Sequence, residues 1–122
     1  MKTQNVNLNE PSTDSQNGQI LEYLRSGETI TSLESLQLFG CFRCASRISF
    51  LRTERNYPIG DVTIEVKSYD RRKNQYVTKR VSAYYIPSAF AEKHGVKQDE
   101  GFFDTVRRYA TTKAQHAFES EE

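Results

Sequence analysis

Hydrophobic residues follow two different periodicities along this 122-residue chain. They recur at helical spacing over 15–26, in two short stretches on either side of Gly40, and over 99–118. They alternate with polar residues over 62–67 and again over 76–86, as in half-buried strands. The pattern predicts a group of helices, then a pair of strands, then a long final helix.

The two short helices around Gly40 carry the clearest start and stop signals. Thr31 followed by Glu34 is a capping box, in which each side chain satisfies a backbone N–H at the helix start. Leu33 and Leu36 then supply the apolar face, with Leu38 and Phe39 as further candidates. Gly40 can adopt the left-handed conformation that ends a helix, so the chain can turn sharply and begin a second helix. This is helix-turn-helix geometry.

The second of these helices has two chemically different sides. At about 100° per residue, its core-facing stripe comprises Cys41, Cys44, Ala45, Ile48, Leu51 and the stems of Arg52 and Arg55. Its opposite side carries Phe42, Arg43, Ser46, Arg47, Ser49, Phe50 and Thr53. A solvated face normally mixes Glu with Lys, whereas this side has only Glu54 at its edge. Arginine, serine and threonine are the side chains that read base edges and phosphates in a major groove.

The two predicted strands form an antiparallel hairpin around a polar, turn-prone segment at 68–75. One face of the hairpin is apolar and comprises Val62, Ile64, Val66, Val77, Val81, Ala83 and Tyr85. The turn contains three adjacent cations, Arg71, Arg72 and Lys73. Beside a recognition helix, such a tip can reach backbone phosphates or a neighbouring minor groove.

Together these elements predict an α+β winged helix-turn-helix fold, with a three-helix core, a β-hairpin wing and a C-terminal helical extension. Residues 1–14 are polar and aperiodic and are expected to form a disordered arm. Residues 15–87 are expected to form the winged domain, and residues 88–122 the extension.

The extension is expected to contain a short helix over 88–94, ended by Gly95, and a long helix over 99–118. The apolar face of the long helix comprises Phe103, Val106, Ala110, Ala114 and either Ala117 or Phe118. Two arrangements are open. The helix packs back over the three-helix core, or it pairs with a second copy to form a homodimer that presents two recognition helices to DNA.

The net charge of +1 hides an uneven distribution. The segments 1–19, 20–86 and 87–122 carry net charges of −1, +4 and −2. Between Phe42 and Arg80, ten basic groups face four acidic ones, a local charge of +6 over the second helix and the hairpin. An ordinary solvated surface is the alternative explanation.

The chain has no membrane-length apolar run and no signal-peptide core. The protein is therefore expected to be cytoplasmic and without a membrane partner.

Cys41 and Cys44 have CxxC spacing, and His94 and His116 are the other possible zinc ligands. No second pair has ligand spacing, and both cysteines lie on the predicted core side, so buried reduced thiols are expected and no metal or cofactor. The chain has no P-loop, GxSxG or HExxH motif and no suggestive carboxylate pair. It is therefore not expected to be an enzyme.

The run QNGQILEYLRSGETITSLESLQLFGCFRCASRISFLRTERNYPI, followed by a basic hairpin ending in AYYIP, resembles the small winged helix-turn-helix domains of bacteriophage and prophage genes. The resemblance covers residues 15–87 and rests on the capping region, the LFGC turn, the Arg-Ile-Ser helix and the Tyr-Pro-Ile exit. It implies DNA binding. Phe42 and Phe50 depart from the polar character expected on the exposed side of the helix.

Two functions follow from the sequence. The first is sequence-specific binding of double-stranded DNA by a phage or mobile-element protein, acting as a transcriptional regulator or a recombination accessory factor. Its expected DNA-binding residues are Arg43, Ser46, Arg47, Phe50, Arg71, Arg72 and Lys73. The second is a protein-interaction module whose Phe42 and Phe50 dock on a host protein, such as a polymerase or a defence nuclease.

Overall fold

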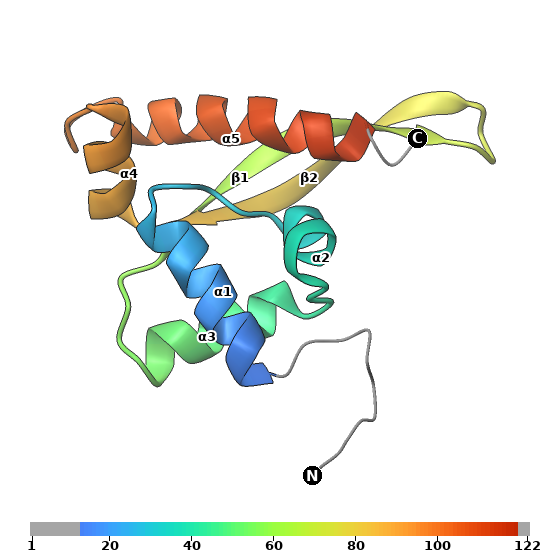
Figure 1. Cartoon of the computed structure of the whole chain (residues 1–122). Coiled ribbons are helices and arrows are strands. Elements are labelled where there is room, and N and C mark those ends of the chain that lie inside the picture. The colour runs from blue at the N-terminus through green and yellow to red at the C-terminus, as the bar shows by residue number, and fades with distance from the viewer. Residues whose placement is uncertain (1–12, 120–122) are drawn as a thin grey trace, which may run out of the picture.

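The computed structural model describes residues 13–119. Its first three helices are α1 (Thr13–Arg25), α2 (Ser32–Phe39) and α3 (Cys44–Thr53), which pack around one apolar cluster (Figure 1). The buried members of that cluster are Ile20, Leu24, Ile30, Cys41, Cys44, Ile48, Leu51, Ile59 and Ile86. The arm expected over 1–14 lies outside the described residues, apart from residues 13 and 14, which belong to α1.

The predicted capping box and turn are both present. The Thr31 hydroxyl accepts the Glu34 N–H, and a Glu34 carboxylate oxygen accepts the Thr31 N–H at 2.8 Å. Gly40 has φ +65°, in the left-handed region, and its N–H bonds the Leu36 carbonyl at 2.9 Å. The predicted apolar face of α2 is right only in part. Phe39 packs against the three-helix cluster, but Leu33 and Leu36 are only half-buried, Leu38 is exposed, and the buried residues are Glu34 and Ser35.

Helix α3 begins three residues after the buried Cys41, and its buried side chains are Cys44, Ile48 and Leu51. This stripe is narrower than predicted. Ala45, which was expected in the core, is exposed. It follows Cys44 by one residue, a rotation of about 100° around the helix axis, and this rotation places it on the outer side. Arg55 lies beyond the end of the helix and is also exposed.

Strands β1 (Gly60–Asp70) and β2 (Gln75–Tyr85) form the predicted antiparallel hairpin, with Gly60 opposite Tyr85 and Asp70 opposite Gln75. Strand β1 extends further than predicted at both ends and β2 begins one residue earlier, so the turn is only residues 71–74. A short bridge joins the hairpin to the helices: Ile30 and Tyr84 exchange two backbone hydrogen bonds of 3.0 and 2.9 Å.

Helices α4 (Pro87–His94) and α5 (Phe102–Glu119) complete the fold, and Gly95 ends α4 in the left-handed region at φ +64°. Helix α5 lies along the hairpin, on the side away from α3 (Figure 1). Its main contact is with β1, rather than with the three-helix core as one of the two expected arrangements had it. A second apolar cluster fills this interface, and its buried members are Val62, Ile64, Val66, Ala83, Tyr85, Phe90, Phe102, Val106, Ala110 and Ala114.

The predicted phase of α5 is wrong at its first turn. Phe102 is buried, whereas Phe103 is 59% exposed. Gly101, at φ +94°, precedes the helix, so α5 begins at Phe102. The buried side then repeats every four residues through Val106 and Ala110 to Ala114.

A polar network ties α5 to the start of α2. The Lys113 ammonium bonds the Thr29 carbonyl, lies 3.1 Å from a Glu34 carboxylate oxygen and sits 4.6 Å from the centre of the Tyr23 ring. The Glu34 side chain is only 6% exposed, so the Lys113 ammonium lies beside a buried carboxylate. One carboxylate therefore caps α2 and binds α5.

Glu28 extends the network to α4. It accepts bonds from Lys93 and, at 2.7 Å, from the Tyr109 hydroxyl, and it lies 3.8 Å from the Lys113 ammonium. Burial opposes its charge, but these bonds and the two lysine charges outweigh it, so the pKa of Glu28 lies below its ordinary value of 4.5. Its carboxylate stabilises the fold above pH 4.5, and this contribution is lost as the pH falls through the lowered folded pKa.

We expect Lys113→Met to lower the free energy of unfolding by about 3 kcal/mol, because it removes the ammonium that lies beside a buried carboxylate. Urea denaturation at neutral pH measures the change. The matched control is Lys97→Met, at an exposed position between α4 and α5, which should change stability little. Adding Glu34→Gln to Lys113→Met should recover part of the loss, and no recovery would show that the ion pair is not the cause.

Candidate nucleic-acid interface

The start of α3 carries an exposed cation, Arg43. Arg43 is the N-cap residue, is exposed, and donates from Nη2 to the Ser46 hydroxyl at 3.4 Å. Ser46 is half-buried in the first turn of the helix. Both residues therefore lie where the sequence placed them, next to each other at the N-terminal end of α3.

Arg47 is turned further inward than the sequence suggested. Its side chain is half-buried, and its Nε atom is buried with no hydrogen-bond partner among the described residues. An unpaired buried N–H costs free energy, so a group that bonds this nitrogen would be stabilising. Arg47 thus belongs to the outer side of α3 only in part.

The two phenylalanines of α3 behave differently from each other. Phe42 is 73% exposed, just before the first turn. Phe50, expected on the open side, is half-buried and packs against the three-helix cluster. Arg55 rests over the Phe50 ring, 5.3 Å from its centre, which places a second cation on this side of the molecule.

Arg52 joins α3 to the base of the hairpin, a role that the sequence analysis missed when it assigned only its stem to the core. Its Nε donates to the Ile59 carbonyl at 2.8 Å, and its Nη2 lies 2.9 Å from an Asp61 carboxylate oxygen. The guanidinium also lies 5.7 Å from the centre of the Tyr84 ring. These contacts fix the direction of α3 relative to the hairpin.

The hairpin turn is ordered by side chain to backbone bonds. One Asp70 carboxylate oxygen accepts the N–H groups of Arg72 and Lys73 at 3.0 and 3.3 Å, and Asn74 adopts the left-handed region at φ +53°. Arg71, Arg72 and Lys73 are all exposed. A hollow of about 330 Å³ beside the turn is lined by Arg71, Arg72 and also Lys79, which adds a fourth cation to those predicted.

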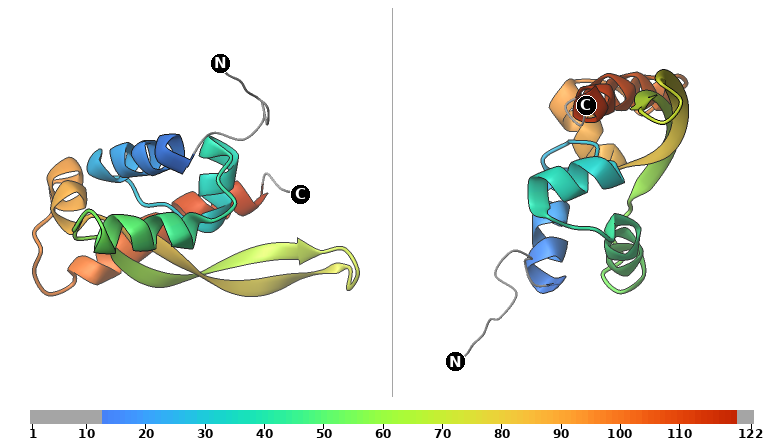
Figure 2. Two further views of the ribbon diagram at one scale, coloured as in Figure 1. Left: turned by 90° about the horizontal axis from the view of Figure 1, so that it is seen from below. Right: turned by 90° about the vertical axis from the view of Figure 1, so that its right-hand side faces the viewer.

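The start of α3 faces the side of the molecule on which the hairpin turn projects beyond the helices (Figure 1). Seen from that side, the turn lies at the top beside α5 and α3 lies at the bottom (Figure 2). Helix α5 does not cover α3, because it lies on the other side of the hairpin (Figure 2). The seven predicted site residues thus fall into two groups, one at α3 and one at the hairpin turn. Arg52 and the Ile30 bridge connect those groups through the hairpin base.

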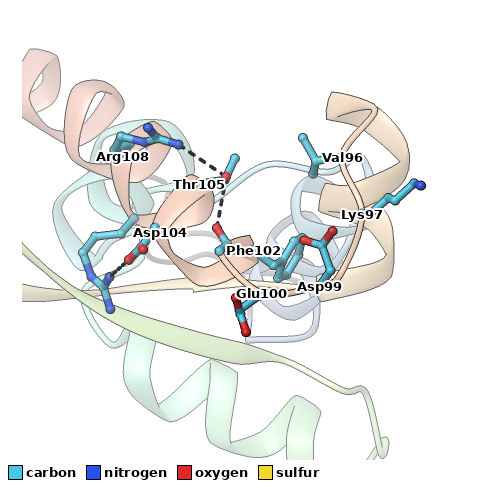
Figure 3. A pocket seen from close by; sticks show the side chains of 10 residues that line it. Val96, Lys97, Asp99, Glu100, Phe102, Asp104, Thr105 and Arg108 are labelled. Carbon is cyan, nitrogen blue, oxygen red and sulfur yellow. Dashed lines mark hydrogen bonds and ion pairs between the residues drawn. The ribbon is translucent and has the colours of Figure 1, made fainter.

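A larger hollow, of about 740 Å³, lies at the corner between α4 and α5 (Figure 3). Two of its charged groups pair with each other, Arg107 with Asp104 at 2.9 Å. Arg108 donates to the Thr105 hydroxyl at 3.4 Å (Figure 3). The described residues show no arrangement of acid, base and nucleophile in it.

The two cysteines are free and buried. Burial raises the pKa of the Cys44 thiol to about 11, so this thiol stays protonated and poorly reactive at neutral pH. Within residues 13–119, no three or more His, Cys, Asp or Glu side chains cluster in a way that could hold a metal ion. None of the helices described here is both long and apolar enough to cross a bilayer.

Comparisons with known proteins agree with this geometry. Residues 15–55, from α1 to just beyond α3, match the family model described as a winged helix-turn-helix domain. No curated protein and no solved structure gives a significant match to the chain. The helices of the matched region are followed here by an antiparallel hairpin and its covering helix. The protein therefore has an α+β winged helix-turn-helix fold with a C-terminal helical extension, and such a domain suggests DNA binding.

Proposed function

We propose that this protein binds double-stranded DNA with sequence specificity. The start of α3 enters the major groove, where Arg43, Ser46 and Arg47 contact base edges or adjoining phosphates. The three cations of the hairpin turn hold the backbone. The observation that carries the proposal is that the exposed Arg43 caps the start of α3, which faces the same side of the molecule as the cationic hairpin turn and is not covered by α5.

Two predicted residues take more specific roles in this proposal. Phe50 contributes to the DNA surface mainly by carrying Arg55, whose guanidinium then faces a phosphate. The buried, unpaired Nε of Arg47 gains a partner if the side chain swings out to a base or phosphate. Arg47 then acts after docking, whereas Arg43 is already presented.

We also propose the biological setting. The resemblance of residues 15–87 to phage and prophage domains supports a phage or mobile-element protein that acts as a transcriptional regulator or as a recombination accessory factor. Residues 88–119 serve the winged domain by packing, since α5 shares its core with the hairpin. A homodimer would have to use another surface, such as the outer face of α5 around the exposed Phe103.

We expect Arg47→Ala and Lys73→Ala to weaken DNA binding in different ways. Arg47→Ala, which removes a base contact, should cost about 1–3 kcal/mol of binding free energy on a preferred site and relax the base preference. Lys73→Ala, which removes a phosphate contact, should weaken binding to all sequences alike and reduce the salt slope by about one unit. Titration of a selected site and a scrambled duplex at several salt concentrations separates the two effects.

Lys97→Ala, at an exposed cation away from the proposed surface, is the matched control and should leave both measurements unchanged. An Arg47→Ala protein with wild-type affinity and sequence preference would remove that residue from the site. If Lys73→Ala and wild type had equal salt slopes, the hairpin turn would likewise be excluded from the proposed DNA-binding surface.

A second function is favoured by one observation. Phe42 and Leu38, on either side of the Gly40 turn, are 73% and 52% exposed, which suits an anchor for a host protein such as a polymerase or a defence nuclease. Phe50 adds less to such an anchor than the sequence suggested, because it is half-buried.

We expect Phe42→Ala to abolish capture of a host protein from lysate and to leave DNA affinity unchanged if this second function is the correct one. Phe103→Ala, which removes another exposed ring from a different surface, is the matched control. Pull-down run beside a DNA gel shift measures both. Loss of DNA binding in Phe42→Ala, with capture intact, would exclude this function for the Gly40 turn.

A further inference from the structure

A pair of tyrosines lies near the far end of the hairpin. Tyr69 and Tyr76 are directly opposite in the strand register, with ring centres 5.1 Å apart and planes at 75°. The Tyr69 hydroxyl bonds the Asn74 side chain, so Tyr69 is held between the turn and its partner ring. Tyr76 is 59% exposed and presents an aromatic surface to solvent.

No apolar core requires these rings. Neither tyrosine belongs to either apolar cluster of residues 13–119. Two bonds join the side-chain amide of Gln115 on α5 to the Lys67 backbone, at 2.8 and 3.0 Å, and both tyrosines lie on the turn side of Lys67. With strands of 11 residues, the hairpin spans about 36 Å. The tyrosine pair therefore stands on the part that projects from the body.

The surroundings of Tyr76 combine cations with a hollow. Residues 67–80 contain six basic side chains and one acidic one, Asp70, which is engaged by the turn. A hollow of about 460 Å³ beside the Tyr76 ring is lined by Glu65, Lys67, Gln115 and Glu119. The two carboxylates disfavour a phosphate there, whereas carboxylates accept hydrogen bonds from the amino groups of bases.

An exposed aromatic ring flanked by cations is the chemistry that binds unpaired nucleotides, because every base offers a face for stacking. In a continuous duplex those faces are covered by neighbouring base pairs. A continuous duplex therefore offers no base face on which Tyr76 can stack. A duplex that opens into single strands does offer one, because its first unpaired base is uncovered and lies beside the phosphates.

We propose that the hairpin tip recognises DNA in which a duplex adjoins unpaired nucleotides, an inference that rests on the proposed DNA-binding function. The first unpaired base stacks on Tyr76 and enters the adjacent hollow. Arg71, Arg72 and Lys73 hold the phosphates on either side. The protein then prefers forks, gaps and overhangs over blunt duplex.

The alternative role of the tyrosine pair is structural, since a cross-strand aromatic pair stabilises a hairpin without any ligand. The test therefore compares two DNA probes with the same protein. One is a blunt duplex of mixed sequence, and the other is the same duplex with five unpaired nucleotides on each strand at one end. The first unpaired position carries 2-aminopurine, whose fluorescence falls when it stacks on a ring.

Wild type should bind the forked probe about tenfold more tightly than the blunt one, as expected for one base stacked at 1–3 kcal/mol, and should quench 2-aminopurine. Tyr76→Phe keeps the ring and should preserve both effects. Tyr76→Leu should lose both and retain its affinity for blunt duplex. Tyr69→Phe, which removes only the hydroxyl bond to Asn74, is the control for hairpin order and should behave as wild type.

Equal wild-type affinity for the two probes without quenching would overturn the inference and leave duplex binding intact. An undiminished preference in Tyr76→Leu would overturn it as well, whatever the stability of that variant. Failure of wild type to bind either probe would instead remove the proposed function on which the inference rests.

Discussion

The structure depends on the packing of α5 against the apolar face of the hairpin. A two-stranded hairpin in water is marginally stable at best, and this one has strands of 11 residues. Burial of Val62, Ile64 and Val66 under α5 supplies the hydrophobic stabilisation that the hairpin lacks on its own. Ala110 and Ala114 are small buried residues of α5, so the helix can approach the strands closely.

The same helix is coupled to the helix-turn-helix. Lys113 reaches from α5 to Glu34, the residue that caps α2, while Arg52 reaches from α3 to Asp61 at the start of β1. The hairpin is therefore linked directly to α3, and its covering helix α5 is linked to α2. A surface that reads DNA with two separate elements needs such links, because a small change in the angle between the elements would move one of them out of contact.

Local signals made much of the fold predictable. The capping box at Thr31, the left-handed Gly40 and Gly95, and the alternation of β1 depend on residues close in sequence, and all were confirmed. The errors arose where residues distant in the sequence determine which side chains are buried. Phe102 rather than Phe103 is buried because the hairpin face sets the phase of α5, and α2 buries Glu34 because Lys113, 79 residues later in the chain, lies beside it.

The candidate site was predictable in its residue types but not in its geometry. The charge concentration between Phe42 and Arg80 pointed to α3 and the hairpin, and Arg43, Arg71, Arg72 and Lys73 are exposed on these elements. Sequence periodicity did not show that Arg47 is partly buried, that Phe50 packs inward, or that Arg52 is engaged at the hairpin base. Each of these depends on how α3 meets the segment 56–61 and the hairpin, which is a long-range property.

The proposed DNA-binding surface comprises the start of α3 and the outer half of the hairpin. Backbone amide chemical shifts, followed in solution while duplex DNA is added, test this proposal directly. The largest shifts should fall within residues 42–50 and 67–80, with little change on α1 and on the outer face of α5. Shifts concentrated on α1 or α5, with α3 and the hairpin unaffected, would contradict it.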